Sequence, residues 1–243
     1  MRVAVLSDIH SNLQALDAVL ASIGTVDAIW QLGDVVGYGP EPDGVVERLV
    51  EVGAVGVMGN HDMAACGGLS LEDFNPDART ASEWTRNRIR ESTRAYLAAL
   101  PKLLVPAGSG FTLAHGSPRD PIWEYLDSPW AAQESLASIG TPYCLVGHTH
   151  VPVVFRERRH GGIAATRVES DGRLQLDDRR VVLNPGSVGQ PRDGNSSASY
   201  LILDTVTGLA VWRRAAYDIG ATQAAMLTAG LPPRLAGRLK VGQ

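Results

Sequence analysis

The sequence predicts an α/β fold, and three observations support this. Strand-like and helix-like segments alternate over the first 60 residues, which is typical of β-α-β units around a parallel sheet. The second half contains a series of short strand-like segments, whose close spacing favours antiparallel hairpins. The chain has 243 residues, 44% of them apolar, and no linker-like stretch, so we expect one domain over residues 1–243.

The first half yields its elements in order. Apolar strands that suit a buried sheet are expected at residues 2–7, 27–33 and 54–59. Helices are expected at 12–23, where apolar residues recur at helical spacing, and at 43–53. Residues 77–100 predict one long helix or two short ones, ended by Pro101.

The second half is predicted to be mainly β, from "KLLVPA" (102–107) to "LAVWRRAAY" (209–217). An Asp-Gly pair marks a turn within "ESDGRL" (169–174). A final helix is expected at 218–230, and residues 231–243 are expected to fray.

Composition and charge exclude several classes of protein. The net charge is −4 with both signs intermixed, so no nucleic-acid partner is expected, and nucleic acid stays possible as a substrate only. The two cysteines, Cys66 and Cys144, form no C-x-x-C pair, which argues against a thiolate zinc site and a disulfide framework. No apolar run approaches the ~18 residues of a membrane span, and no signal-like segment opens the chain. We therefore expect a cytoplasmic protein without a membrane segment.

Polar side chains follow five of the predicted strands. Ligands of open α/β sheets collect at the carboxyl edge of the strands, so these side chains form a candidate site. The candidates are Asp8, His10, Asp34, Asn60, His61, Asp62, His115, His148 and His150. A lone aspartate at such a place is usually a helix N-cap, and Asp8 competes with Asn12 for that role. If these residues had only structural roles, that would have to be true at all five strand ends at once, which favours a functional site. His160 follows no such strand; it lies among arginines and is expected in a solvated loop.

The residue types indicate a metal site. Imidazole and carboxylate without thiolate suit Mn²⁺, Fe²⁺ or Zn²⁺. Seven candidate ligands are too many for one tetrahedral zinc, and they fit two metals that share a carboxylate. Two aspartates and a bridging hydroxide would leave a residual positive charge, which attracts and polarises an anion, as two-metal hydrolysis requires.

The order of these motifs resembles that of the calcineurin-like metallophosphoesterases. The matching motifs are "DIH" (8–10), "GD" (33–34), "GNHD" (59–62), "HGS" (115–117) and "GHTH" (147–150). The segments "GDVVGYGPEPDGVVE" and "NPGSVGQPRDG" further resemble a bacterial and archaeal branch of small single-domain phosphodiesterases. The resemblance covers residues 1 to about 205, and it implies a four-layer α/β/β/α sandwich of two mixed sheets flanked by helices.

The resemblance also implies a role for each candidate. Asp8, His10 and His150 would hold a first divalent metal. Asn60, His115 and His148 would hold a second, with Asp34 bridging the two. His61 would protonate the leaving group, with Asp62 as the residue that orients it. The implied cofactor is a pair of divalent ions, Mn²⁺ first, with Fe²⁺, Zn²⁺ and Ni²⁺ as alternatives.

One departure bears on the substrate. Phosphatases of this superfamily carry the pattern G-D-x-x-D-R-G, whereas Gly37 and Tyr38 stand at its second aspartate and its arginine here. Without that arginine, a dianionic monoester would lose a charged partner, and a monoanionic diester would lose less. The expected activity is therefore hydrolysis of phosphodiester bonds by in-line attack of a metal-bridging hydroxide. The alternatives are a phosphomonoesterase, a dinucleoside polyphosphate hydrolase, and a protein-binding scaffold of the same fold.

The substrate is expected to be a small phosphate ester or a nucleotide-type molecule. Candidate contacts to it are Tyr38, Arg119 and Arg192. The segment 184–194 is either a simple turn after a strand or a loop that borders the pocket. Trp123 and Tyr125 would either stack on a base or cover the site.

Overall fold

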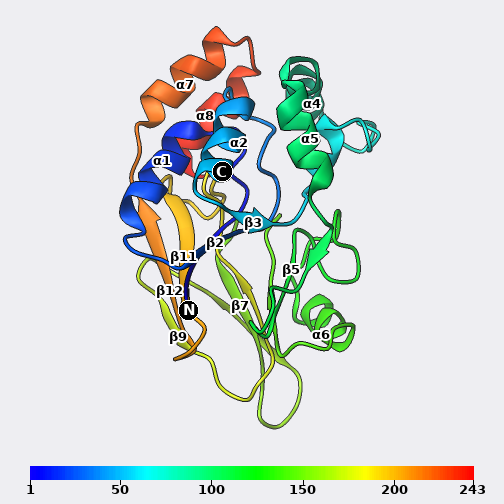
Figure 1. Cartoon of the computed structure of the whole chain (residues 1–243), viewed down its shortest axis with the longest axis vertical. Helices are drawn as coiled ribbons and strands as arrows, with labels where there is room; N and C mark the ends of the chain where they lie inside the picture. Colours follow the sequence, from blue (N-terminus) through cyan, green and yellow to red (C-terminus); the bar gives the residue numbers. More distant parts are fainter.

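Two six-stranded sheets lie face to face at the centre of the molecule (Figure 1). The computed structural model describes residues 1–243. The first sheet has the order β3 (Val55–Gly56), β2 (Ala28–Gln31), β1 (Arg2–Leu6), β11 (Ala198–Asp204), β12 (Leu209–Ala215) and β9 (Arg173–Gln175). The second has the order β4 (Leu103–Leu104), β5 (Phe111–Ala114), β6 (Tyr143–Leu145), β10 (Val181–Asn184), β7 (Val153–Glu157) and β8 (Ile163–Arg167).

Both sheets are mixed. In the first sheet β1, β2 and β3 run parallel, as the alternating pattern predicts, and β11 pairs with β1 antiparallel. In the second sheet β5, β6 and β10 also run parallel, so the expectation of antiparallel hairpins throughout the second half is wrong there. The reason is helix α6 (Pro129–Ala137), which the sequence analysis missed; it carries the chain from β5 back to the start of β6.

Alternating burial along β1 explains the layers. Val3 and Val5 point between the sheets, where they pack with Trp30 and Phe111. The intervening side chains point outward, against the helices over the first sheet. A strand that is buried on both faces reads as continuously apolar, which is how residues 2–7 appear in the sequence. With helices outside both sheets, the four-layer α/β/β/α sandwich is confirmed.

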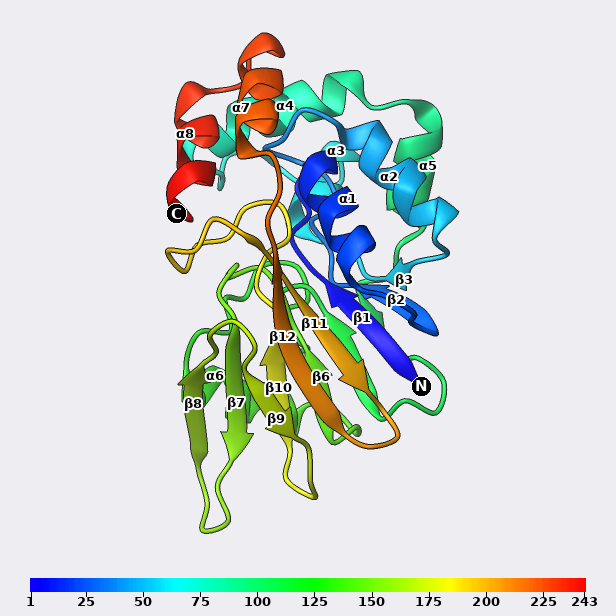
Figure 2. The same ribbon diagram turned by 90° about the vertical axis from the view of Figure 1, so that its left-hand side faces the viewer.

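The helices fall into three groups. The outer face of the first sheet is covered by α1 (Leu13–Ser22), α2 (Pro42–Glu51) and α5 (Glu91–Ala99). Helix α6 packs alone on the second sheet. The end of the sandwich nearest the carboxyl ends of β1 and β2 carries α3 (Asn60–Ala65), α4 (Pro76–Arg88), α7 (Ile219–Thr228) and α8 (Pro233–Val241), as Figure 2 shows.

Helix ends follow the sequence in some places and correct it in others. Asn12 caps α1, because its Oδ1 accepts a hydrogen bond from the Ala15 N–H at 3.1 Å, so Asp8 is free of that role. Residues 77–100 form two helices, α4 and α5, separated by extended backbone at Ile89. The expected fraying after residue 230 is wrong: α8 forms there, with Leu235 and Leu239 buried.

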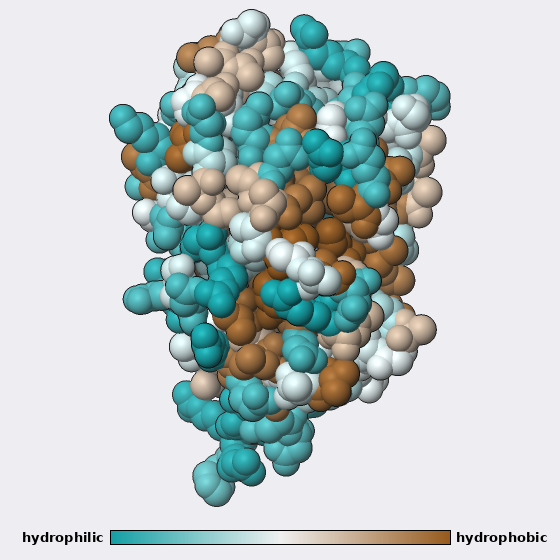
Figure 3. All heavy atoms as spheres, turned by 60° about the vertical axis from the view of Figure 1, so that its left-hand side comes forward, coloured by the Kyte–Doolittle hydropathy of each residue, from teal (hydrophilic) through white to brown (hydrophobic).

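The molecular surface is divided by polarity. Figure 3 shows apolar side chains gathered across the middle of one face, with hydrophilic residues above and below them.

His160 is exposed in the turn between β7 and β8, as expected. Cys144 is buried, Cys66 is partly buried, and neither forms a disulfide. None of the helices combines the length and apolarity that crossing a lipid bilayer would require.

Candidate metal centre

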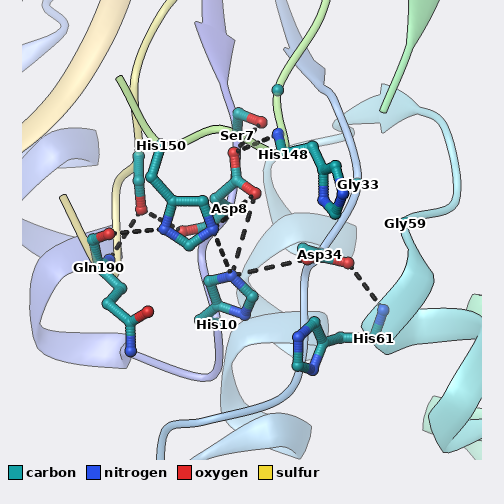
Figure 4. A network of polar contacts seen from close by, with 12 residues as sticks. Ser7, Asp8, His10, Gly33, Asp34, Gly59, His61, His148, His150 and Gln190 are labelled. Atoms are coloured by element: carbon teal, nitrogen blue, oxygen red, sulfur yellow. Dashed lines mark hydrogen bonds and ion pairs between the residues drawn. The ribbon is translucent and has the colours of Figure 1, made fainter. Parts of the chain in front are cut away.

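The predicted polar residues converge at the carboxyl ends of four strands, and Figure 4 shows Asp8, His10, Asp34, His148 and His150 among them. Asp8 and His10 follow β1, Asp34 follows β2, His115 follows β5, and His148 and His150 follow β6. Asn60 and His61 belong to the first turn of α3, so they begin a helix instead of ending a strand. All of these side chains are buried.

At most of the candidate ligands, a left-handed backbone conformation, and not an extended strand, directs the side chain into the site. The expectation that Asp8 and His10 share a face of an extended strand is wrong, because β1 ends at Leu6. The non-glycine residues of the site with positive φ are Asp8 (52°), His10 (50°), Ser11 (53°), Asp34 (51°), Tyr38 (56°), His148 (64°) and His150 (59°). Only Asp171 shares this conformation elsewhere. Such residues cost about 1–3 kcal/mol each and cluster at functional sites.

Two glycines make room for the side chains. A Cβ on Gly59 would lie 2.2 Å from Oδ1 of Asp34. A Cβ on Gly37, which has φ +92°, would lie 2.6 Å from Nδ1 of His61. Position 37 therefore has no space for the aspartate that the phosphatase motif carries there.

The first group of candidate ligands comprises Asp8, His10, Asp34 and His150, with one donor atom from each within 4.8 Å of the others. The His10 and His150 Nε2 atoms are 3.2 Å apart. Oδ1 of Asp8 lies 3.2 Å from Nε2 of His150, and Oδ2 of Asp34 lies 3.6 Å from Nε2 of His10.

The second group comprises Asp34, His115 and His148. Nε2 of His115 lies 3.3 Å from Oδ2 of Asp34 and 3.0 Å from Nδ1 of His148. Oδ1 of Asn60 lies 3.1 Å from the same His115 nitrogen, which places the amide at this group. Asp34 belongs to both groups and stands between them.

Backbone carbonyls fix the orientation of three imidazoles. The Nδ1 atoms of His10, His115 and His150 face the carbonyl oxygens of Val36, Leu32 and Gln190, at 3.2, 2.9 and 2.6 Å. Nδ1–H donation to a carbonyl leaves the Nε2 lone pair directed into the site, which is the usual support for a metal-binding histidine.

A divalent cation fits this arrangement. The lone pairs of His10 and His150 oppose each other at 3.2 Å, and a shared cation would remove the repulsion. Oδ1 of Asp8 and Nε2 of His148 are buried and accept or donate no hydrogen bond. Buried polar atoms without partners are costly, and a mixed imidazole–carboxylate set is one that Mn²⁺, Fe²⁺ and Zn²⁺ accept.

Burial and charge shift the pKa values of these groups. Burial lowers the pKa of His148 to about 3 and keeps its imidazole neutral, as a ligand must be. Burial would also lower the pKa of His115, but Asp34 outweighs it and raises that pKa to about 9. Burial would raise the pKa of Asp34, whereas His115 and His61 hold it well below the usual range. Asp34 is therefore ionised.

His61 lies beside the two groups, held by packing and a serine. Its ring contacts those of His10, Tyr38 and Phe74, with centroids 5.0, 4.4 and 5.0 Å away. Its Nδ1 lies 3.3 Å from the buried Ser82 Oγ on α4, a contact that no sequence motif signals. Burial lowers the pKa of His61 to about 4, against the opposing effect of Asp34.

Asp62 does not orient His61, so that expectation is wrong. Its two carboxylate oxygens accept hydrogen bonds from the N–H groups of Gly59, at 2.9 Å, and Val36, at 3.0 Å. It thus closes the first turn of α3 and ties it to the chain after β2. Burial and the neighbouring charge of Asp34 raise the pKa of Asp62 to about 7.

A small pocket of about 70 Å³ opens onto the site, and two of the three expected substrate contacts line it. Tyr38 and Arg192 do so, with the guanidinium 5.9 Å from the tyrosine ring centroid. Arg119 does not, because it pairs with Glu124 and stacks on Trp130. The expectation for Arg119 is therefore wrong.

Tyr125 and Trp123 line the pocket from the other side. Tyr125 stacks on the ring of His148, with centroids 3.9 Å apart, and so covers a candidate ligand. Phe74 continues this aromatic wall by an edge contact with Trp123. The sequence alone left open whether these rings stack on a base or cover the site; in the structure Tyr125 covers the site, because its ring lies on that of His148.

The loop at 184–194 borders the site. Its Ser187 hydroxyl donates to the carbonyl oxygen of Asp8 at 2.8 Å, and its Gly189 N–H donates to the same oxygen at 2.9 Å. Gln190 supplies the carbonyl that holds His150. The loop thus fixes the turn after β1 and carries Arg192 to the pocket.

Comparison with known proteins matches this architecture. Residues 1–208 match the model of the calcineurin-like phosphoesterase superfamily domain. An uncharacterised protein of Methanocaldococcus jannaschii is 36% identical over 99% of this chain and 98% of its own length. A metallophosphoesterase structure from Sphaerobacter thermophilus is 43% identical with a TM-score of 0.91, covering 100% of this chain and 99% of that one. A hypothetical protein from Pyrococcus horikoshii shares the fold at 21% identity, with a TM-score of 0.82 over 100% of this chain and 98% of its own.

The family match covers most of the chain, and it includes all of the strand-end motifs that converge on the site. The chain therefore belongs to the calcineurin-like phosphoesterase superfamily.

Proposed function

We propose that this protein is a two-metal hydrolase of phosphodiester bonds. The observation that carries the proposal is the position of Asp34, which belongs to two separate groups of candidate ligands. A carboxylate between two imidazole-rich groups is what a bridged metal pair needs. Membership of the superfamily implies phosphoester hydrolysis, and the choice of diester is our own inference.

The geometry supports one distribution of ligands. Asp8, His10 and His150 would hold a first ion, and Asp34 would be shared between it and a second. Asn60, His115 and His148 would hold the second ion. Mn²⁺ is the proposed metal, because the set contains hard oxygen donors beside imidazoles and no thiolate.

The two ions, when bound, supply charge neutralisation at phosphorus and an acidified water as the nucleophile. The chain contributes the rest. Asp34 and Asp8 fix the ions, Arg192 attracts the anionic ester, and His61 holds a proton for the leaving oxygen. His61 is neutral in the free protein, and the negative charge of a bound phosphate raises its pKa toward the working range.

A phosphomonoesterase or a dinucleoside polyphosphate hydrolase is the second candidate. Arg192 favours it, because this guanidinium reaches the ring of Tyr38, at the position where phosphatases carry an arginine. A protein-binding scaffold is disfavoured, since every ligand position is filled. We also propose a cytoplasmic location, which suits two cysteines without a disulfide.

The test is metal content followed by turnover of matched esters. We expect two ions per chain by elemental analysis of protein loaded with Mn²⁺. We expect a higher kcat/KM for a nitrophenyl phosphodiester than for nitrophenyl phosphate. A clear monoester preference would overturn the diester assignment, and the lack of any metal-dependent turnover would overturn the enzymatic one.

A further inference from the structure

A second cavity adjoins the proposed catalytic pocket. It has a volume of about 550 Å³ and no hydrophobic lining residue. Asn75 lines both cavities, so they meet at the start of α4. The catalytic pocket, at about 70 Å³, encloses little more than a scissile phosphate, so the rest of a substrate must lie outside it.

Three arginines line the two cavities. Arg192 lines the first, and Arg234 and Arg238 of α8 line the second. Burial, followed by the charge of Arg192, lowers the pKa of Arg238, and Arg234 adds to the repulsion. Like charges in proximity are unfavourable unless an anion joins them.

Neither Arg192 nor Arg238 forms an ion pair with a side-chain carboxylate. Arg238 donates from Nε to a main-chain oxygen of Gln243, the last residue of the sequence, at 2.7 Å, and forms no ion pair with a side-chain carboxylate. Arg192 donates from Nη2 to Oε1 of Gln190 at 2.8 Å, while its Nε is buried without any partner. Asp77 lines the same cavity: its carboxylate oxygen lies 3.9 Å from Nε of Arg234, and its charge opposes the lowering of the Arg238 pKa.

Packing holds α8 in place beside the site. Leu235 and Leu239 of this helix share an apolar cluster with Tyr38, which lines the catalytic pocket. At the helix end, the carbonyl oxygen of Gly242 accepts a hydrogen bond from the N–H of Gly194 at 2.9 Å. Figure 2 shows α8 and the chain end beside the loop between β10 and β11, which carries Arg192. The superfamily domain matches only residues 1–208, so α8 lies outside it.

We propose that Arg238 and Arg234 form a second anion-binding subsite beside Arg192, which selects phosphodiesters that carry a further phosphate group. This proposal rests on the proposed function. The scissile phosphate would lie in the first cavity, and the further phosphate would lie in the second. The planar guanidinium group suits this role, because it binds phosphate oxygens in pairs.

The test compares two nitrophenyl esters of thymidine 5′-phosphate, one of which has an additional 3′-phosphate. We expect the intact protein to show a kcat/KM at least about tenfold higher for the 3′-phosphorylated ester, as charge-assisted bonds to phosphate predict. Arg238→Gln should bring this ratio close to one, whereas Arg238→Lys should keep part of it. Lys240→Gln is the matched control, since it removes one exposed charge from the same helix and should leave the ratio unchanged.

Binding without turnover gives a second readout. Calorimetric titration of metal-free protein with thymidine 3′,5′-bisphosphate should show at least about tenfold tighter binding than with thymidine 5′-phosphate. Arg238→Gln should remove the difference. Equal binding and equal kcat/KM for both forms would overturn the subsite, even with two metals bound and both esters hydrolysed. Hydrolysis of neither ester would overturn the proposed function, while the titration would still decide on the subsite.

Discussion

His61 is the residue whose role differs most from the phosphatase pattern. Its Nδ1 faces the Ser82 hydroxyl. The aspartate that the phosphatase motif carries is absent here, because Gly37 lies too close to the ring for any side chain at that position. A neutral hydroxyl orients the ring without fixing a charge on it. His61 therefore depends on the bound phosphate for the charge that a catalytic acid needs.

We expect His61→Ala to lower kcat by about 10²–10⁴-fold, the usual range for general acid–base catalysis. Both metals should remain bound, as elemental analysis would show. A nitrophenolate leaves with little protonation, so the loss should be smaller for a nitrophenyl diester than for an alkyl diester. His148→Ala is the contrasting variant, because it should lose metal and fail on both substrates. Equal losses on both esters in His61→Ala would show that this ring positions phosphate instead of protonating the leaving group.

Asp34→Asn should weaken both metal sites at once. The carboxylate is ionised and within 3.6 Å of imidazoles from both groups, and an amide cannot neutralise two cations. Elemental analysis should find fewer than two ions per chain after dialysis. Asp73→Asn is the control, since this exposed aspartate lines the pocket but belongs to neither ligand group. Full occupancy and normal activity in Asp34→Asn would refute the bridging role.

At the scale of elements, the sequence predicts the strands and helices that have a clear apolar periodicity and misses features that depend on contacts between distant segments. The order of strands and helices through α2 follows from apolar periodicity, and the polar residues after strands identify the site. Helix α6 was missed because its apolar spacing is weak, although Ser128 and Pro129 mark its start. Ser82 was missed because no spacing relates α4 to His61. The left-handed turns could not be read either, since they depend on contacts between segments far apart in the chain.

One contact between elements yields a prediction. Gly59, at the start of α3, approaches Asp34, after β2, so closely that any Cβ would strike the carboxylate. Gly59→Ala should therefore reduce metal content and lower kcat/KM by at least about tenfold, although no ligand is removed. Gly140→Ala is the matched control, because a Cβ there meets no atom within 4 Å. Unchanged metal content in Gly59→Ala would mean that the two turns can separate without harm to the site.

At the scale of the whole molecule, we propose that residues 1–243 unfold as one unit. Ligands from β1, β2, α3, β5 and β6 meet at one place, so metal binding links both sheets. A ligand at 100 times its Kd stabilises a fold by about 2.7 kcal/mol, which for a chain of this size raises Tm by about 5–10 °C. Calorimetry with Mn²⁺ and with a chelator should show one transition that shifts by this amount. Two transitions, or equal Tm values under both conditions, would contradict this coupling.

The pairing of β1 has a consequence for biosynthesis. This strand comes first in the sequence, yet one of its two neighbours, β11, ends at Asp204, and Arg2 pairs with that residue. The loop that fixes the turn after Asp8 lies at 184–194. A nascent chain that ends before β11 thus lacks one of the two neighbours of β1, and non-local pairing of this kind forms late. We therefore expect metal binding only after nearly the whole chain has been translated. A prematurely terminated product would contain the ligand motifs but would not bind metal.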